Sequence, residues 1–511
     1  MLPTFTEWKH QLPSPLYDQE PSWVELYWAA WDIAFRNFHN PTAGSGFVSP
    51  FIDAAFNANI FLWDTCFMTM FCNYAYPLVP GISSLDNFYC KQHEDGEINR
   101  EIDRTTGSDV EAWVNSENKA LFSRWGWQDE AQTHAVTYRG RSAPHPNPLL
   151  TLDALDHPIL AWAEVESYRV TGDEQRLAIV WEPLLRYYNA LTYYLRQGNG
   201  LFVTDWASMD NSPRNPYLRG GGTGIDISSE MVLFARNMGA IASALGKQDE
   251  MSKFAAEADD VARRINEQMW DAERQFYFDV TLDGRRAPVK SVAAYWTLLA
   301  HVASPRQADA LIAELRNPHT FHRLHRVPTL AADEPAYDPS GGYWRGAAWA
   351  PTTTMVLRGL EMYGHHQLAR EIALNHMRCM DGVFRKTGSI WENYAPDAVE
   401  PGRPAKNDFV GWSGLGPIMY LLEYAVGLKP DARRNELQWT VSTSQRAGCR
   451  RFRFNGHVID LVAEPDSSDR QGIALSIVSS GSFRLVVDWH GKKQSFEVAT
   501  GKNEYTVVDC R

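Results

Sequence analysis

The stretch SWVELYWAAW, residues 22–31, carries the pattern that decides the fold. Its larger apolar side chains recur at spacings of three and four residues, which is typical of a helix with one buried face. Further runs of this kind cover residues 159–170, 181–196, 229–245, 250–270, 292–303, 307–315, 346–363, 367–380 and 413–424. The sequence therefore predicts a large all-α domain, and helix pairs repeating every roughly 30–45 residues fit a toroid of paired helices.

The pattern changes after Pro430. Segments such as RFRFNGHVIDLVAE (451–464) and FRLVVDWHG (483–491) alternate apolar and polar residues and contain Asn-Gly or His-Gly pairs. This alternation predicts short antiparallel strands joined by hairpin turns. We therefore expect two domains, a helical catalytic domain of residues 1–429 and a small β-sandwich-like domain of residues 430–511.

Composition limits the classes of partner. The chain has 511 residues and a formal charge of −13, which disfavours binding to nucleic acid or to an anionic membrane. No apolar run is long enough to span a bilayer, and the N-terminus lacks the pattern of a secretory signal. The six cysteines form no CxxC pair. We expect a cytoplasmic protein, unless a signal segment was removed before residue 1.

Aromatic residues are frequent, at 12% of the chain, and 19 of them are tryptophans. Flat aromatic rings stack on the C–H faces of sugars, so a carbohydrate site would explain some of these tryptophans. Buried aromatics also dominate the packing of any large domain. We assign roughly two-thirds of the tryptophans to the core and the others to a pocket.

Two acidic residues stand out because they lie in segments that do not continue a helical pattern. Asp210 lies in TDWASMDNSPR (204–214), and Glu392 lies in IWENYAP (390–396), 182 positions later. Hydrolysis of an acetal needs one carboxylic acid that protonates the departing oxygen and a second carboxylate that activates water or attacks carbon. The alternative for Asp210 is a helix-capping role in an ordinary turn, and the alternative for Glu392 is an exposed position in an aromatic-edged loop.

Other segments offer hydrogen-bond donors and acceptors for sugar hydroxyls. Arg345 lies in GGYWRGAAWAP (341–351) at an expected helix start, where backbone N–H groups and a guanidinium can bind hydroxyls. A structural arginine in an aromatic-packed helix start is equally compatible with this segment. No HExxH, Cys/His set, phosphate-binding loop or GxSxG motif is present, so we expect no metal and no organic cofactor.

Taken together, FLWDTCF (61–67), QHEDGEINREI (92–102), TDWASMDNSPR, YWRGAAW (343–349) and IWENYAP resemble the inverting α-glycosidases of glycoside hydrolase family 63. The likeness is greatest to the mannosylglycerate/glucosylglycerate hydrolase-like group, and the trehalases of family 37 are more distant. The five segments stand in the order that the family has them and cover roughly residues 61–428. Three features depart from the family pattern: Ala347, where a proline is more usual, the distinct C-terminal β domain after Pro430, and the lack of a large N-terminal β domain.

The resemblance implies an (α/α)6 barrel with Asp210 as general acid and Glu392 as general base. The residues that it implies for the lining of the pocket are Trp63, Asp64, Gln92, Arg100, Glu101, Trp206, Arg214, Trp344, Arg345 and Trp349. We expect an inverting, exo-acting α-glycosidase that hydrolyses a small α-linked glucoside or mannoside. A glycoside phosphorylase, a sugar epimerase and a non-catalytic carbohydrate-binding protein are the alternatives, since a fold does not fix a function.

Overall fold

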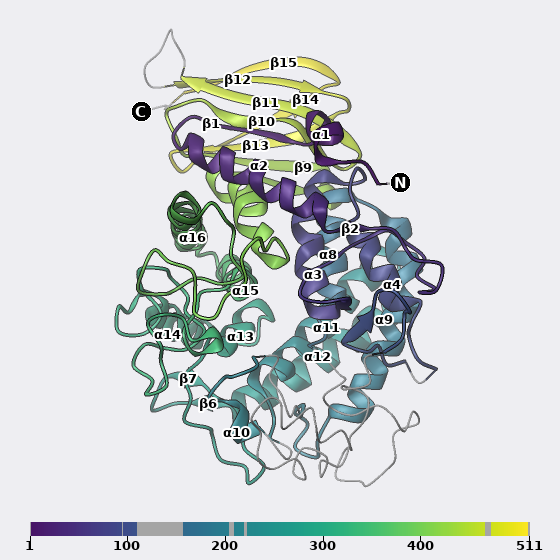
Figure 1. The fold of residues 1–511 in the computed structure, drawn as a ribbon, viewed down its shortest axis with the longest axis vertical. Helices are drawn as coiled ribbons and strands as arrows, with labels where there is room; N and C mark the ends of the chain where they lie inside the picture. The colour runs from purple at the N-terminus through teal and green to yellow at the C-terminus, as the bar shows by residue number, and fades with distance from the viewer. Residues whose placement is uncertain are drawn as a thin grey trace.

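The computed structural model describes residues 2–94, 96–109, 157–203, 209–218, 222–465 and 472–508. Helices are the main elements of one part of the molecule, and two stacked β-sheets cover one end of it (Figure 1). The longer helices are α2 (Pro21–Arg36), α3 (Leu62–Cys72), α8 (Leu160–Thr171), α9 (Glu174–Leu195), α11 (Ile225–Ala244), α12 (Gln248–Gln268), α14 (Pro305–Arg316), α15 (Ala350–Met362), α16 (His366–Thr387) and the π-helix η9 (Gly416–Val426). The short ones are α1 (Phe5–Trp8), α4 (Asp86–Tyr89), α10 (Asn215–Leu218) and α13 (Trp296–Leu299).

The helices fall into two kinds that their burial separates. Every residue of α3 is buried, and so are the first eleven residues of α15, Ala350–Leu360. Helix α12 instead buries one stripe, formed by Phe254, Ala258, Val261, Ala262 and Ile265. A helix that is buried all round lies inside a domain, whereas a helix with one apolar stripe covers its surface. The helical pattern predicted from residues 22–31 is confirmed by α2, which buries the same apolar residues.

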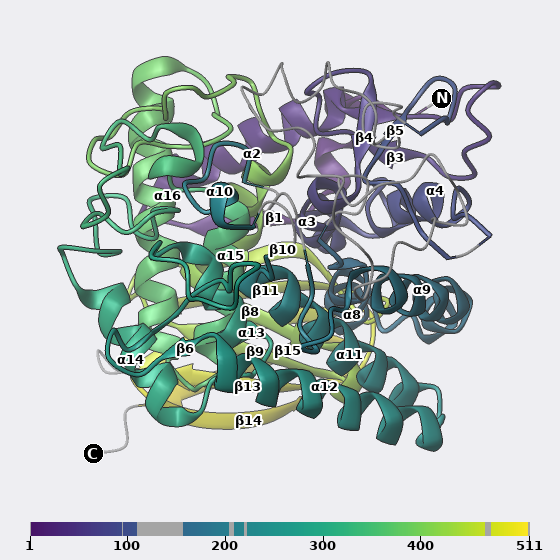
Figure 2. The ribbon, with the colours of Figure 1, turned by 90° about the horizontal axis from the view of Figure 1, so that it is seen from below.

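The inner helices contact one another in a regular order. Helix α3 contacts α8, α8 contacts α11, α11 contacts α13, and α13 contacts α15. The 3-10 helix η8 (Trp412–Leu415) contacts both α15 and α3, so the order returns to its beginning. Outside them, α12 packs on α11 and α16 packs on α15 (Figure 2). A largely helical domain is thus confirmed, and the closed toroid stays a prediction.

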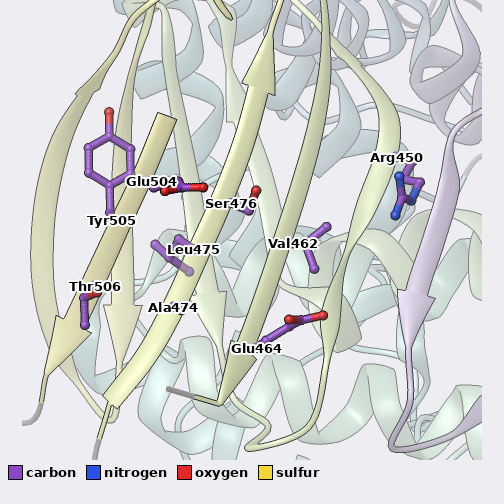
Figure 3. Close-up of a pocket in the computed structure, with 9 residues that line it drawn as sticks. All are labelled: Arg450, Val462, Glu464, Ala474, Leu475, Ser476, Glu504, Tyr505 and Thr506. Atoms are coloured by element: carbon purple, nitrogen blue, oxygen red, sulfur yellow. The ribbon is translucent and has the colours of Figure 1, made fainter. Parts of the chain in front are cut away.

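The strands after residue 428 form two sheets that pack against each other. One sheet has the order β1-β10-β11-β12-β15 and the other β14-β13-β9-β8. Their bounds are β1 (Ser14–Tyr17), β8 (Leu428–Asp431), β9 (Glu436–Val441), β10 (Ala447–Phe454), β11 (His457–Pro465), β12 (Gly472–Ser479), β13 (Phe483–Trp489), β14 (Lys492–Val498) and β15 (Gly501–Val508). Burial alternates along them: Leu475 and Ile477 are buried, whereas Ser476 and Glu504 are exposed on the outer face (Figure 3).

Two features of the sheets differ from the predicted antiparallel C-terminal unit. Strands β9 and β13 run parallel, because the chain crosses to the other sheet between them. Strand β1 comes from the N-terminus and pairs with β10 at the edge of the larger sheet. Its Pro15 fits this place, since an edge strand tolerates a residue without an N–H donor.

Short two-stranded ladders support the helical domain. They pair β2 (Phe38–His39) with β3 (Phe51–Ile52), β4 (Asn59–Phe61) with β5 (Glu101–Asp103), and β6 (Trp270–Asp271) with β7 (Phe276–Tyr277). Among the residues that the structure describes, no helix is both long enough and apolar enough to cross a membrane.

Candidate active site

Helix α3 begins next to the β4–β5 ladder, and this ladder places Asp64. The Leu62 N–H donates a hydrogen bond to the Arg100 carbonyl at 2.9 Å, where the chain leaves β4 and enters α3. Asp64 therefore lies in the first turn of α3, and only 8% of its surface is exposed. The N-terminus of a helix favours a negative charge, so the ionised carboxylate is stabilised there.

Asp210 lies in a turn that is held by its own neighbours. The Asn215 side-chain amide donates to the carbonyls of Met209 and Asp210, at 3.0 and 3.2 Å. This side chain thus fixes the Asp210 backbone at the point where α10 begins, at Asn215. Asp210 itself is half-buried.

Arg214 anchors this turn to the core. Its Nε and one terminal nitrogen donate to the two carboxylate oxygens of Asp279 at 2.9 and 2.8 Å, and the other terminal nitrogen donates to Asp226 at 2.7 Å. All three side chains are buried. Burial disfavours the charge of Arg214, but Asp226 and Asp279 together raise the pKa of its guanidinium. The predicted pocket residue Arg214 is therefore fully engaged in holding the turn that carries Asp210.

Glu392 is almost completely buried, with 4% of its surface exposed. The Tyr343 hydroxyl donates to Glu392 Oε1 at 2.7 Å, and the Lys406 N–H donates to Oε2 at 2.9 Å. The Glu392 N–H donates to the Lys406 carbonyl at 2.9 Å, and the Glu392 carbonyl accepts from Trp412 Nε1 at 2.9 Å. Burial raises the pKa of the Glu392 carboxyl, and the hydrogen bonds from Tyr343 and Lys406 oppose this rise.

Residues 341–346, which we call the 341–346 turn, join the two acidic segments. Tyr343 has φ +63°, in the left-handed region that residues other than glycine rarely adopt. Gly342 before it has φ +53°, and a Cβ there would lie 2.7 Å from a neighbouring side-chain atom. The Asn211 side chain bridges to this turn: Nδ2 donates to the Gly342 carbonyl at 2.9 Å, and Oδ1 accepts from the Trp344 N–H at 3.0 Å.

The charges of three carboxylates act on the Tyr343 hydroxyl. Burial raises the pKa of Tyr343, and the negative charges of Glu392, Asp210 and Asp64 raise it further. These acids come from segments that are far apart in the chain. Because that hydroxyl stays protonated, it acts as a hydrogen-bond donor to Glu392.

Tryptophans form a wall beside these acids. Trp344 and Trp349 stack with ring centroids 4.1 Å apart and planes 5° from parallel. Trp63 lies edge-on to Trp344 at 6.4 Å and to Trp412 at 6.2 Å. The Trp63 indole N–H is buried, and none of the described residues accepts a hydrogen bond from it. A buried donor of this kind needs an acceptor, which a sugar hydroxyl can supply.

Two other predicted pocket residues make structural contacts. Gln92 donates to the carbonyls of Gly96 and Pro183 at 2.8 and 2.9 Å, and so ties its loop to α9. Arg345 is exposed, and its Nε donates to the Ala336 carbonyl at 3.2 Å. In both side chains, the polar atoms that were expected to bind a sugar instead donate hydrogen bonds that hold loops in place.

The remaining predicted residues lie beside the start of α3 or outside the described residues. Glu101 Oε1 accepts from the side-chain amides of Asn57 and Asn59, at 3.3 and 2.6 Å. Arg100 precedes it and accepts the α3 N–H through its backbone carbonyl. Trp206 falls in 204–208, which the structure does not describe.

The sequence analysis did not select four residues that matter here. Tyr343, Lys406 and Trp412 contact Glu392 directly, and Asn211, which follows Asp210, bonds to the 341–346 turn. Asn211 and Tyr343 belong to the quoted motifs. Their positions next to Asp210 and Trp344 could therefore have identified them as candidate site residues. Lys406 contributes a backbone N–H, which any residue type except proline has, and no sequence pattern identifies such a donor.

Known proteins share much of this sequence. The sequence profile of the mannosylglycerate hydrolase MGH1-like glycoside hydrolase domain matches residues 113–413, more than half of the chain. An uncharacterised protein of Borreliella burgdorferi is 23% identical over 397 residues, which cover 74% of this chain and 81% of that protein. A probable mannosyl-oligosaccharide glucosidase of Schizosaccharomyces pombe is 28% identical over 207 residues, which cover 37% of this chain and only 25% of that protein.

Solved structures show the same fold. The glycoside hydrolase family 63 mannosylglycerate hydrolase of Thermus thermophilus, in complex with glucose, superposes with a TM-score of 0.57 at 18% identity, covering 76% of this chain and 98% of that one. The α-L-rhamnosidase of Aspergillus terreus superposes with a TM-score of 0.58 at 12% identity, covering 98% of this chain and 50% of that one. Since the family profile spans more than half of the sequence, the chain belongs to the mannosylglycerate hydrolase MGH1-like group of glycoside hydrolase family 63 and is a glycoside hydrolase.

Proposed function

We propose that the chain is an inverting, exo-acting α-glycosidase for a small α-linked glucoside or mannoside, with Asp210 as general acid and Glu392 as general base. The observation that carries this proposal is the pair of contacts made by the 341–346 turn. The Tyr343 hydroxyl donates to Glu392 at 2.7 Å, and the side chain of Asn211, next to Asp210, bonds to Gly342 and Trp344. An inverting glycosidase needs two carboxyl groups that face each other across a gap wide enough for a water molecule. Both carboxyl groups belong to loops beside the tryptophan wall, where a sugar ring can stack.

Glu392 has the properties of a base that activates water. Within the described part of the chain, each of its oxygens accepts one hydrogen bond, and each oxygen has a second lone pair left for water. Its pKa is raised by burial, and a carboxylate with a raised pKa takes a proton from water more readily. In the proposed reaction this water attacks the anomeric carbon from the face opposite the leaving group, and the configuration inverts.

In the proposed reaction Asp210 protonates the glycosidic oxygen. The Asn215 side chain holds the Asp210 backbone, and Asn211, the next residue, bonds to the 341–346 turn that also contacts Glu392. The cation Arg214 of the same turn is paired with Asp226 and Asp279. The acid donates its proton to the departing alcohol, and the C–O bond breaks.

We also propose that the helices form an (α/α)6 barrel with this site at one mouth. The cyclic order of contacts from α3 through α8, α11, α13, α15 and η8 back to α3 supports it. The superposition on the Thermus thermophilus hydrolase agrees with the same architecture. At such a mouth, Trp63, Asp64 and Trp344 line a pocket that holds the terminal sugar, and the fully buried Trp349, which the sequence analysis expected in the lining, instead backs Trp344.

The proposed substrate class rests on the relatives. Their names include a mannosylglycerate hydrolase and a mannosyl-oligosaccharide glucosidase, so glucose and mannose are the sugars to test first. A pocket closed at one end accepts the terminal sugar of a chain or a monosaccharide conjugate, which is what exo-acting means here. Asp64 would bind hydroxyls of that sugar, and Trp63 would donate its indole N–H to another.

The test is a panel of α-linked disaccharides and glycosylglycerates assayed with wild type and with the variants Asp210→Asn and Glu392→Gln. Each variant should lower turnover by about two to four orders of magnitude, because general acid and base catalysis contribute that much. Glu334→Gln is the matched control: Glu334 is a half-buried carboxylate that accepts the Lys290 N–H at 2.8 Å, away from the site. Near-wild-type turnover by Asp210→Asn or Glu392→Gln on every cleaved substrate would overturn the assignment.

A further inference from the structure

One short piece of backbone touches both proposed catalytic segments. Tyr343, which lies in the 341–346 turn, donates a hydrogen bond to Glu392. Asn211, which follows Asp210, forms two hydrogen bonds with the same turn. We propose that Tyr343 and Asn211 are positioning residues, Tyr343 for the base and Asn211 for the acid, and that the 341–346 turn thereby sets the distance between the two carboxyl groups. This inference rests on the proposed function.

The positioning of the proposed base, Glu392, depends on a tyrosine whose ring is held in place. The Tyr343 carbonyl accepts from Trp349 Nε1 at 3.3 Å, and its ring lies against the Trp349 ring with centroids 4.8 Å apart at 77°. The left-handed φ of +63° is an uncommon conformation for tyrosine, and the surrounding contacts hold the residue in it. The hydroxyl therefore reaches Glu392 Oε1 from a defined direction, while the Lys406 N–H fixes Oε2. Two donors, one on each oxygen, define the plane of the carboxylate.

The positioning of the proposed acid, Asp210, depends on the side-chain amide of Asn211, whose nitrogen and oxygen both form hydrogen bonds. Asn211 Nδ2 and Oδ1 pair with the Gly342 carbonyl and the Trp344 N–H, at 2.9 and 3.0 Å, in the manner of one rung of a β-ladder. Asp210 is the preceding residue, so this rung fixes the acid relative to the turn. Arg214 and Asn215 fix the same segment to the core from its other side.

The shared turn has a chemical consequence. In inverting glycosidases the two carboxyl groups are roughly 6.5–9.5 Å apart, against about 5–5.5 Å in retaining enzymes, and the difference is the space for water. A single rigid element that holds both groups keeps that space constant while substrate enters. Loss of either contact should therefore impair one half of the acid–base pair and leave the other intact.

For the base half, the test is the pH profile of kcat/KM for Tyr343→Phe. The hydroxyl stabilises the ionised form of Glu392, so its loss should move the acidic limb of the profile to higher pH, with kcat lower by roughly ten- to a hundredfold. Tyr363→Phe is the matched control, because the Tyr363 hydroxyl donates to the Ala303 carbonyl at 2.5 Å, outside the site. The position of a limb is independent of how much protein is folded. An acidic limb that superposes on that of wild type would overturn the role of Tyr343.

For the acid half, the test is the dependence of Asn211→Ala on the leaving group. Hydrolysis of an alkyl α-glycoside should fall by roughly ten- to a hundredfold, because the acid is displaced. Hydrolysis of the α-glycosyl fluoride of the same sugar should change far less, since fluoride departs with little help from an acid. Asn375→Ala is the matched control: Asn375 also bridges a loop through two backbone contacts, to the Arg326 N–H and the Leu324 carbonyl, both at 2.9 Å.

The ratio of the two rates in one preparation does not depend on the folded fraction, so a partly unfolded variant still gives an answer. An equal loss on both substrates would overturn the role of Asn211. The variants Asp210→Asn and Glu392→Gln are run beside them. If those two keep their activity, the proposed function is wrong. If those two lose activity while Tyr343→Phe and Asn211→Ala behave like wild type, only the positioning roles are wrong.

Discussion

Arg214 and Asp279 form a two-point ion pair from which water is excluded, with N–O distances of 2.9 and 2.8 Å. The sequence analysis expected Arg214 to line the pocket, and its contacts instead assign it to the support of the Asp210 turn. Breaking a buried pair by removing one partner leaves an uncompensated charge, which typically costs about 3–5 kcal/mol.

Arg214→Met should therefore lower the free energy of unfolding by about 3–5 kcal/mol, because Asp226 and Asp279 lose their cation. Thermal or urea unfolding measures this. Arg263→Met is the control, since Arg263 pairs with Glu267 on the surface and should matter by less than about 1 kcal/mol. A variant with wild-type stability and a raised KM would mean that Arg214 binds substrate.

Trp63→Phe should raise KM by roughly two- to tenfold, since it removes an N–H that no described residue accepts and that a sugar hydroxyl can use. Trp439→Phe is its matched control: it loses the same ring volume and also the hydrogen bond from Nε1 to the Val426 carbonyl at 3.0 Å. Trp439→Phe should lower the melting temperature and leave KM unchanged. Equal KM values for the two variants would argue against a sugar contact at Trp63.

Glu392→Gln should melt at a higher temperature than wild type at neutral pH. Burial raises the pKa of Glu392 in the folded state, so ionisation of this group costs stability above that pKa. The cost disappears below the pKa of the unfolded chain, where the carboxyl is protonated in both states. The stabilisation of Glu392→Gln should thus shrink as pH falls, and melting curves across pH measure it. A lower melting temperature for Glu392→Gln at neutral pH would contradict the argument.

Glu423→Gln should show the opposite sign. Burial would raise the pKa of Glu423, but Arg358 and Arg169 outweigh burial and lower it. Its ionised form therefore stabilises the fold at neutral pH, and this contribution is lost as pH falls through the folded pKa. Glu423→Gln should melt below wild type at neutral pH, with a difference that narrows in acid. Melting curves over the same pH range test both glutamates. If both variants shift the melting temperature in the same direction at neutral pH, the proposed effects of burial on Glu392 and of the arginines on Glu423 are wrong.

The sequence predicted those helices and strands whose pattern of apolar residues lies within one short segment of the chain. The apolar spacing of residues 22–31 became α2, because a surface helix buries one face. The run at 292–303 is less regular: it splits into the 3-10 helix η6 (Val292–Tyr295) and α13. Residues 292–300 are all buried, so the apolar spacing that predicted a helix does not fix the helix type or its ends.

Partners that are distant in the chain could not be read from the sequence. The parallel pairing of β9 with β13 depends on how the sheets stack. Arg214 pairs with Asp279, which lies 65 positions later in the chain. The two proposed catalytic acids were identified from their motifs. The hydroxyl that contacts Glu392 was not, since no sequence pattern indicates that a tyrosine beside a tryptophan will donate a hydrogen bond to a distant glutamate.

The central claim is that water, activated by Glu392, attacks the anomeric carbon opposite to the bond that Asp210 protonates. NMR of the first product released from an α-linked substrate, recorded before mutarotation, tests it most directly. We predict that the β-anomer of the free sugar is formed first and that the α-anomer grows in only as the solution equilibrates. If the α-anomer is formed first, the enzyme retains configuration, and Glu392 does not direct water to the opposite face of the sugar.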